Sequence, residues 1–169
     1  MVSLADGTTQ VIQSPVINNV AGAMAIQELL ENMEWVSQAG SPVAYAAHLR
    51  RDPLRGVPAK SVIFQFAKGD LGAANPNTTA ILRAGDLADR TLYYRHDLAR
   101  AEIPSLPLNA HMFMVSIGVA AFREISLGAQ AQIASFFVSE GETIIHPEPA
   151  RFFEVPIQGP LPEDLNYIP

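Results

Sequence analysis

The stretch that decides the fold runs from Ser61 to His111 and reads SVIFQFAKGDLGAANPNTTAILRAGDLADRTLYYRHDLARAEIPSLPLNAH. It opens with a near-continuous apolar run, 61–67, that ends shortly before Asp70. β-Branched and aromatic residues in such a run are typical of a strand buried on both faces, as in a parallel sheet. A second run of this kind, 90–95, predicts a second strand.

The segment between these two strands has the pattern of a helix. The sequence Asn-Pro-Asn-Thr at 75–78 can begin a helix that runs to about Leu87. A strand–helix–strand unit of this length implies a right-handed parallel crossover. The carboxyl ends of parallel strands meet at one edge of a sheet, where ligand sites of α/β proteins lie. Because Asp70 and His111 both follow such ends, we expect an aspartate and a histidine that can pair there.

These residues resemble the C-terminal part of the α/β-hydrolase-fold esterases and lipases, over about 58–125. The similarity lies in PAKSVIFQFAKGD, an Asn-Pro that opens a helix, and then a strand and a loop carrying NAH. In that family a late strand ends in Gly-x-x-Asp or a close variant, which supplies the triad acid. The loop after the next strand supplies the histidine. The resemblance therefore implies Asp70 as the acid and His111 as the base of an esterase-like hydrolase of small carboxylic esters, with no cofactor.

The nucleophile of the family is missing from this pattern. Its serine sits in a G-x-S-x-G elbow, and no such sequence occurs in the chain. The segment before Asp70 is too short for the remaining strands, an oxyanion loop and an elbow. We therefore expect a partial, truncated α/β-hydrolase-like parallel sheet with flanking helices, corresponding to the last third of such an enzyme.

A nucleophile outside the usual elbow has to be sought elsewhere. It can be a serine of this chain, a serine of a second subunit, or a water molecule activated by His111. Ser61 is expected at the wrong end of its strand, and Ser116 follows His111 in a helix that turns it elsewhere. The serines expected in or near loops are Ser14, Ser37, Ser41 and Ser105.

Other side chains offer alternatives to the proposed pair. His96 and Asp97 follow the second strand and form a rival histidine–aspartate source, although neighbours in an extended chain point in opposite directions. His48 has no partner nearby in the sequence and is expected to be structural or exposed. The four histidines show no metal-binding spacing, so we expect no metal site. The alternative function is a non-catalytic, oligomeric remnant or interaction module that keeps the hydrolase C-terminal fold.

We expect residues 1–169 to form a single domain in three segments. The first, 1–60, contains an extended arm or short strand around Val11 and Ile12 and a helix over about Val20–Ala39. The apolar stripe of this helix is expected to pack in the core; it comprises Ile26, Leu29, Leu30, Met33 and Val36.

The second and third segments contain the core and the tail. Residues 61–140 form the strand–helix–strand–helix core, which ends in one helix or two over 112–138, broken near Gly128. Residues 141–169 hold six of the 13 prolines, which predicts an extended C-terminal tail.

Composition indicates which partners to expect. Charged residues make up 17% of the chain, against about 25% in typical soluble domains, and 49% of the residues are hydrophobic. Together with the open edges of so small a sheet, this predicts a homo-oligomer with an apolar interface. The net charge of −6 and the scattered basic residues argue against nucleic acid as a partner.

Location is only weakly indicated by the sequence. There is no cysteine, so disulfides and thiolate chemistry are excluded. No apolar run approaches the roughly 18 residues that suggest a membrane span. The N-terminus has no signal-peptide pattern, so we expect a cytoplasmic chain as written, although the parent family includes secreted proteins.

Overall fold

The computed structural model describes residues 2–3, 9–10 and 21–163. These fall into two compact units, one up to Ser41 and the other from Pro42 onward, and each is described by itself. The expectation of a single domain in three segments stays a prediction.

The described residues of the first unit form a short strand pair and one α-helix. Strand β1 (Val2–Ser3) pairs antiparallel with β2 (Thr9–Gln10). Helix α1 (Ala23–Ser37) is followed by a 3-10 turn, Gln38–Gly40, which confirms the helix expected over about the same residues. The strand expected around residues 11 and 12 lies outside the described residues.

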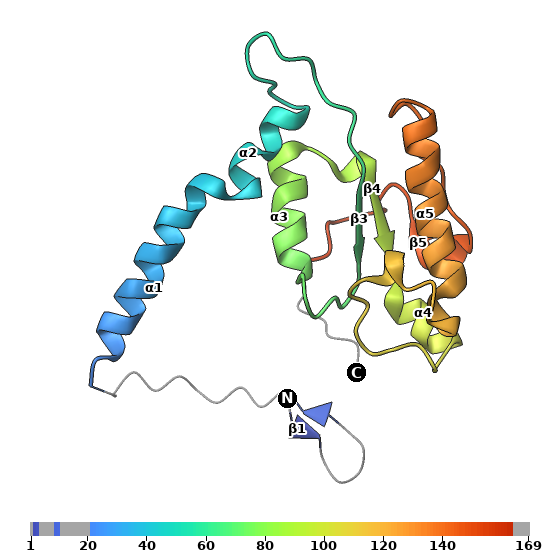
Figure 1. Ribbon diagram of the computed structural model, residues 1–169, viewed down its shortest axis with the longest axis horizontal. Coiled ribbons are helices and arrows are strands. Elements are labelled where there is room, and N and C mark those ends of the chain that lie inside the picture. The colour runs from blue at the N-terminus through green and yellow to red at the C-terminus, as the bar shows by residue number, and fades with distance from the viewer. Residues whose placement is uncertain (1, 4–8, 11–20, 164–169) are drawn as a thin grey trace. The chain divides into compact units, whose positions relative to one another are not determined.

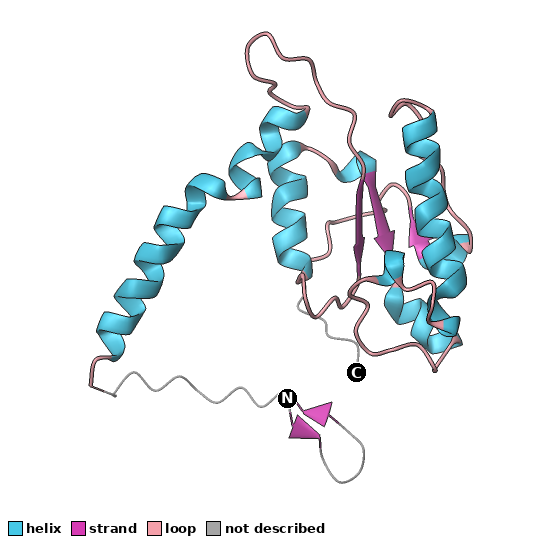
Figure 2. Cartoon of the chain, viewed as in Figure 1, coloured by secondary structure: helices cyan, strands magenta, loops and turns pink. Residues whose placement is uncertain are grey.

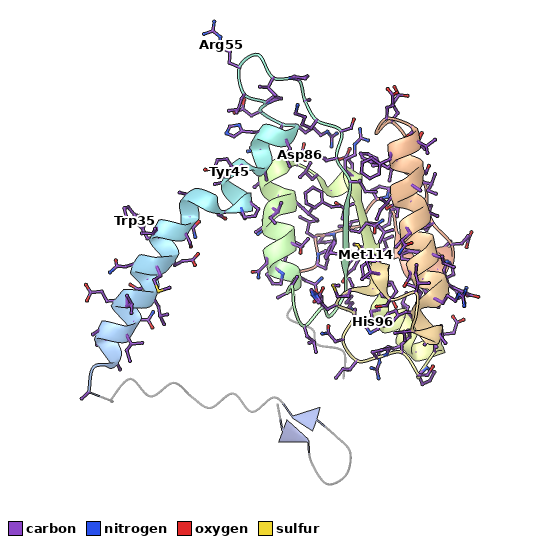
Figure 3. The ribbon with its side chains drawn as sticks, in the orientation of Figure 1. Trp35, Tyr45, Arg55, Asp86, His96 and Met114 are labelled. Atoms are coloured by element: carbon purple, nitrogen blue, oxygen red, sulfur yellow. The ribbon has the colours of Figure 1, made fainter. Side chains whose placement is uncertain are left out.

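The apolar stripe of α1 was expected in the core, and this expectation is wrong. No residue of α1 is buried, and Trp35 is exposed as well (Figure 3). The other described residues of its own unit form only the two-residue strands and a 3-10 turn, which offer too little apolar surface to cover a stripe. Its large exposed side chains are Met24, Ile26, Leu29, Leu30, Met33, Trp35 and Val36.

The second unit is built around a three-stranded sheet in the order β3-β4-β5. Strands β3 (Phe64–Ala67) and β4 (Thr91–Tyr94) are parallel, with Phe64 opposite Thr91, as the strand–helix–strand pattern predicts. The tail adds β5 (Phe153–Glu154), which pairs antiparallel with β4. The sheet is therefore mixed, and the expectation of a parallel sheet is corrected by this one antiparallel pairing.

Helices cover both faces of this sheet (Figures 1 and 2). Helix α3 (Asn75–Gly85) packs on one face, where its Leu82 meets Phe66 and Tyr93. Helix α5 (Arg123–Val138) packs on the other face, where Ile125 and Ala129 meet Leu92 and Tyr94. All four residues of β4 are buried, as predicted for a strand with side chains enclosed on both faces. Two further helices are α2 (Pro42–Leu49) and α4 (His96–Glu102).

The segment 112–138 differs from the expected one or two helices. Two 3-10 turns, Phe113–Val115 and Ala120–Phe122, precede α5, which then runs through Gly128 without a break. A Cβ atom at Gly128 would lie 1.9 Å from the backbone oxygen of Glu148. This glycine therefore lets the tail approach the helix closely and does not end the helix.

Among the helices of the described residues, none combines the length and the apolar character that a membrane crossing requires.

Candidate active site

Asp70 is held by the turn that follows β3. Gly69 has a φ of +72°, a left-handed conformation that glycine adopts without steric cost. The buried side chain of Asn75 fixes this turn. Its Oδ1 accepts a hydrogen bond from the Gly69 N–H at 3.1 Å, and its Nδ2 donates to the Ala67 carbonyl at 3.1 Å. The turn thus projects Asp70 from the carboxyl end of β3.

The Asp70 carboxylate is fixed further by its own loop. Its Oδ1 accepts hydrogen bonds from the N–H groups of Gly72 at 2.7 Å and Ala73 at 2.8 Å. Side-chain-to-backbone bonds of this kind give aspartate its strong preference for turns. Since only 12% of this side chain is exposed, the carboxylate is both oriented and partly shielded from water.

His111 reaches this carboxylate from the loop that follows α4. Its Nδ1 lies 3.0 Å from Oδ1 and 3.1 Å from Oδ2 of Asp70. The ring also packs on Gly72, where a Cβ atom would lie 2.7 Å from Nδ1. The structure thus brings together the two side chains that the sequence pattern had placed at one edge of the sheet.

The pairing fixes the two ring nitrogens of His111 in different roles. An Nδ1–H that donates to a carboxylate leaves Nε2 as the basic nitrogen. Among the described residues none forms a hydrogen bond with Nε2, and the His111 side chain is 44% exposed. This arrangement can take a proton from a hydroxyl or a water molecule at Nε2, with the carboxylate stabilising the imidazolium that results.

The rival source, His96 and Asp97, does not form a second pair. His96 lies at the start of α4 (Figure 3) and is fully buried. The Tyr94 hydroxyl donates to its Nδ1 at 3.0 Å, and its Nε2–H donates to the Pro107 carbonyl at 2.9 Å. Burial lowers the pKa of His96, so this imidazole stays neutral and both of its nitrogens serve the core.

Asp97 belongs instead to a half-buried ion-pair network. Arg95 donates to both of its oxygens, at 2.9 and 2.7 Å, and Lys68 lies 3.2 Å away. Burial raises the pKa of Asp97, but the hydrogen bonds from Arg95 and Lys68 outweigh this and bring it to about 2. Arg95 also binds Glu154 at 2.7 Å, so the network joins α4 to β5. Its charges are mutually satisfied, and we assign it a structural role.

The remaining histidines lie apart from this pair. The Nδ1 of His48, in the last turn of α2, lies 2.7 Å from the Asp52 carbonyl oxygen, which agrees with the expectation that His48 is structural or exposed. His146 is exposed in the tail and contacts the Pro147 carbonyl at 3.4 Å. In the part of the chain that the structure describes, no three His, Asp or Glu side chains cluster as metal ligands would.

No described serine hydroxyl forms a hydrogen bond with His111. Ser37 and Ser116 donate to carbonyls of their own helical turns, those of Glu34 and Met112. Ser61 packs against Gly141, and a Cβ atom placed on that glycine would lie 2.8 Å from the Ser61 Oγ. Ser105 forms no hydrogen bond with either residue of the pair, Ser41 belongs to the other unit, and Ser14 lies outside the described residues.

Two residues of the site were not anticipated from the sequence. Asn109 accepts hydrogen bonds from both loops of the pair, and Gly72 leaves the space that the His111 ring occupies. Asparagine often accepts a hydrogen bond from the backbone N–H two residues further on, so its place two positions before His111 could have drawn attention to Asn109. Nothing in the sequence distinguishes Gly72 from an ordinary loop glycine.

Comparison with known proteins adds no relative: no protein-family model, no curated protein and no solved structure matches the chain. The resemblance to the α/β-hydrolase family therefore stays a prediction from the residues quoted above.

Proposed function

We propose that this protein is an esterase-like hydrolase of small carboxylic esters in which His111 is the base and Asp70 is the acid that orients it. The observation that supports this most directly is the 3.0 Å hydrogen bond between Nδ1 of His111 and the Asp70 carboxylate, two side chains 41 residues apart. The carboxylate holds the imidazole in the Nδ1–H tautomer, which leaves Nε2 free to take a proton.

The nucleophile in this proposal lies outside a G-x-S-x-G elbow. A hydroxyl or a water molecule at Nε2 of His111 would give up its proton and attack the ester carbonyl. The proton would then pass from the imidazolium to the departing alcohol, which completes the hydrolysis when water is the attacking group. When a hydroxyl attacks, the acyl group stays on its oxygen until a water molecule, deprotonated at Nε2 in the same way, attacks the acyl-enzyme. The hydroxyl then takes the proton back as the carboxylic acid leaves. The Asp70 carboxylate would stabilise the positive ring.

Ester turnover tests this proposal. The wild type is expected to hydrolyse p-nitrophenyl acetate and butyrate above the buffer rate. His111→Ala removes the general base, and Asp70→Asn removes the carboxylate that orients it. Each is expected to lower kcat/KM by about 10²–10⁴-fold, the usual contribution of a positioned general base. His146→Ala, which removes an exposed histidine far along the chain, should match the wild type. Equal rates in all four proteins would contradict the proposal.

Two observations favour a second candidate, a non-catalytic oligomeric module that keeps this fold. No described serine reaches His111, and large apolar side chains are exposed, including Phe137 and Val138 at the end of α5. Light scattering separates a homo-oligomer, which we propose in either case, from a monomer. Stable oligomers without reaction toward a fluorophosphonate probe and without ester turnover would favour the module.

A further inference from the structure

The loops that carry Asp70 and His111 are joined by one side-chain oxygen. Oδ1 of Asn109 accepts a hydrogen bond from the Leu71 N–H at 3.0 Å and another from the His111 N–H at 2.9 Å. Leu71 directly follows the acid, and His111 is the base. A single acceptor therefore fixes the backbone of one loop against the backbone of the other.

The loop after Asp70 has a hydrogen-bond acceptor for each of its first three backbone N–H groups only when Asn109 is in place. Three successive N–H groups, those of Leu71, Gly72 and Ala73, point to side-chain oxygens. Asp70 takes the last two, and Asn109 takes the first. The same Asp70 oxygen also binds the imidazole, so any shift of this loop moves the carboxylate relative to the ring.

The position of Asn109 indicates that its role is not core packing. The residue is exposed, so its replacement removes little buried apolar surface. Its two hydrogen bonds are exposed to solvent, where a hydrogen bond contributes little to the free energy of folding. The geometry of the pair is more sensitive, because a displacement of about 1 Å at a catalytic group can cost about 10²-fold in rate.

We propose that Asn109 is a positioning residue that sets the Asp70–His111 distance by bridging the two loops. The inference rests on the role proposed for this pair, but it concerns the pair's geometry and can be measured without substrate. A free histidine side chain favours the Nε2–H tautomer, so the Nδ1–H tautomer of His111 reports directly on its hydrogen bond to Asp70.

The test is the tautomer of His111, read by two-bond 15N–1H correlation NMR at alkaline pH, where imidazoles are neutral. The wild type is expected to hold the Nδ1–H form. Asn109→Ala is expected to shift His111 toward the Nε2–H form, whereas Asn109→Asp, which keeps an oxygen at the same position, should retain the wild-type tautomer. Asn77→Ala, an exposed asparagine on α3, is the matched control and should also retain it.

If Asn109→Ala does not fold, Asn109→Gln takes its place, because it keeps the amide and moves the oxygen by one methylene. A wild-type tautomer in the Ala or Gln variant would overturn the proposal, as would an Nε2–H tautomer in the wild type. Where ester turnover is measurable, Asn109→Ala should lower kcat by about tenfold or more with KM unchanged. Absence of turnover together with the expected tautomer shift would contradict the proposed function and leave the positioning role of Asn109 intact.

Discussion

Replacing Gly72 with alanine is expected to separate His111 from Asp70 without unfolding the protein. The new Cβ atom would lie 2.7 Å from Nδ1, 2.8 Å from Cε1 and 2.9 Å from Cγ of the ring. Carbon atoms do not approach this closely, so something has to move. The ring is the part that can move, because it is the end of a side chain that is 44% exposed. The backbone at residue 72 does not require glycine, since its φ is not positive.

The expected result of Gly72→Ala is a loss of about 10²-fold in kcat/KM for p-nitrophenyl butyrate, with little change in stability. Urea denaturation should give a free energy of unfolding within about 0.5 kcal/mol of the wild type. Gly118→Ala is the matched control, because its Cβ atom would meet nothing within 4 Å. Wild-type turnover in Gly72→Ala would show that the packing of the His111 ring on Gly72 does not affect ester hydrolysis.

Replacing a second glycine, Gly128, with alanine is expected to lower the stability of the protein and to leave the site unchanged. A Cβ atom at Gly128 would lie 1.9 Å from the Glu148 oxygen and 3.0 Å from its carbonyl carbon. Both are backbone atoms, and the Phe153 ring is 3.5 Å away, so the tail cannot yield as a surface side chain does. Alanine in place of glycine within a helix ordinarily stabilises by about 1 kcal/mol. Here we expect the clash to outweigh this gain.

The expected result of Gly128→Ala is a net loss of about 1–3 kcal/mol in the free energy of unfolding, the usual cost of overpacking. For a chain of this size each kcal/mol corresponds to roughly 2–4 °C in Tm. Urea and thermal denaturation measure both, with Gly118→Ala again as the control. A variant as stable as the wild type would show that the tail does not pack against α5 as closely as described.

The pairing of Asp70 with His111 could be anticipated because it depends on features that a sequence carries. The runs at 61–67 and 90–95 indicated two buried strands, and the helix between them made the strands parallel. Segments that follow the carboxyl ends of adjacent parallel strands start from the same edge of the sheet. This geometry and the family resemblance together led to the expected pair, whereas the helix α4 between β4 and His111 was not foreseen.

Features that depend on tertiary contacts were not anticipated. Helix α4 begins directly after β4, where only a loop was expected, and Arg95 and Asp97 hold it to β5 through Glu154. Strand β5 has two residues and exists because β4 offers it a partner, which no local pattern reveals. Gly128 led us to expect a break in the helix because glycine has poor helix propensity. The structure shows another reason for a glycine at this position, namely that the backbone of residue 148 leaves no room for a Cβ atom.

The central claim is that Asp70 acts through His111 as one acid–base unit, and a double-mutant cycle tests it most directly. The measurement is kcat/KM for p-nitrophenyl butyrate in the wild type, His111→Ala, Asp70→Asn and the double variant. If the carboxylate works only by orienting and stabilising the imidazole, its loss has no further effect once the imidazole is gone. The expected result is therefore a double variant no slower than His111→Ala. Losses that multiply in the double variant, or single variants as fast as the wild type, would contradict the claim.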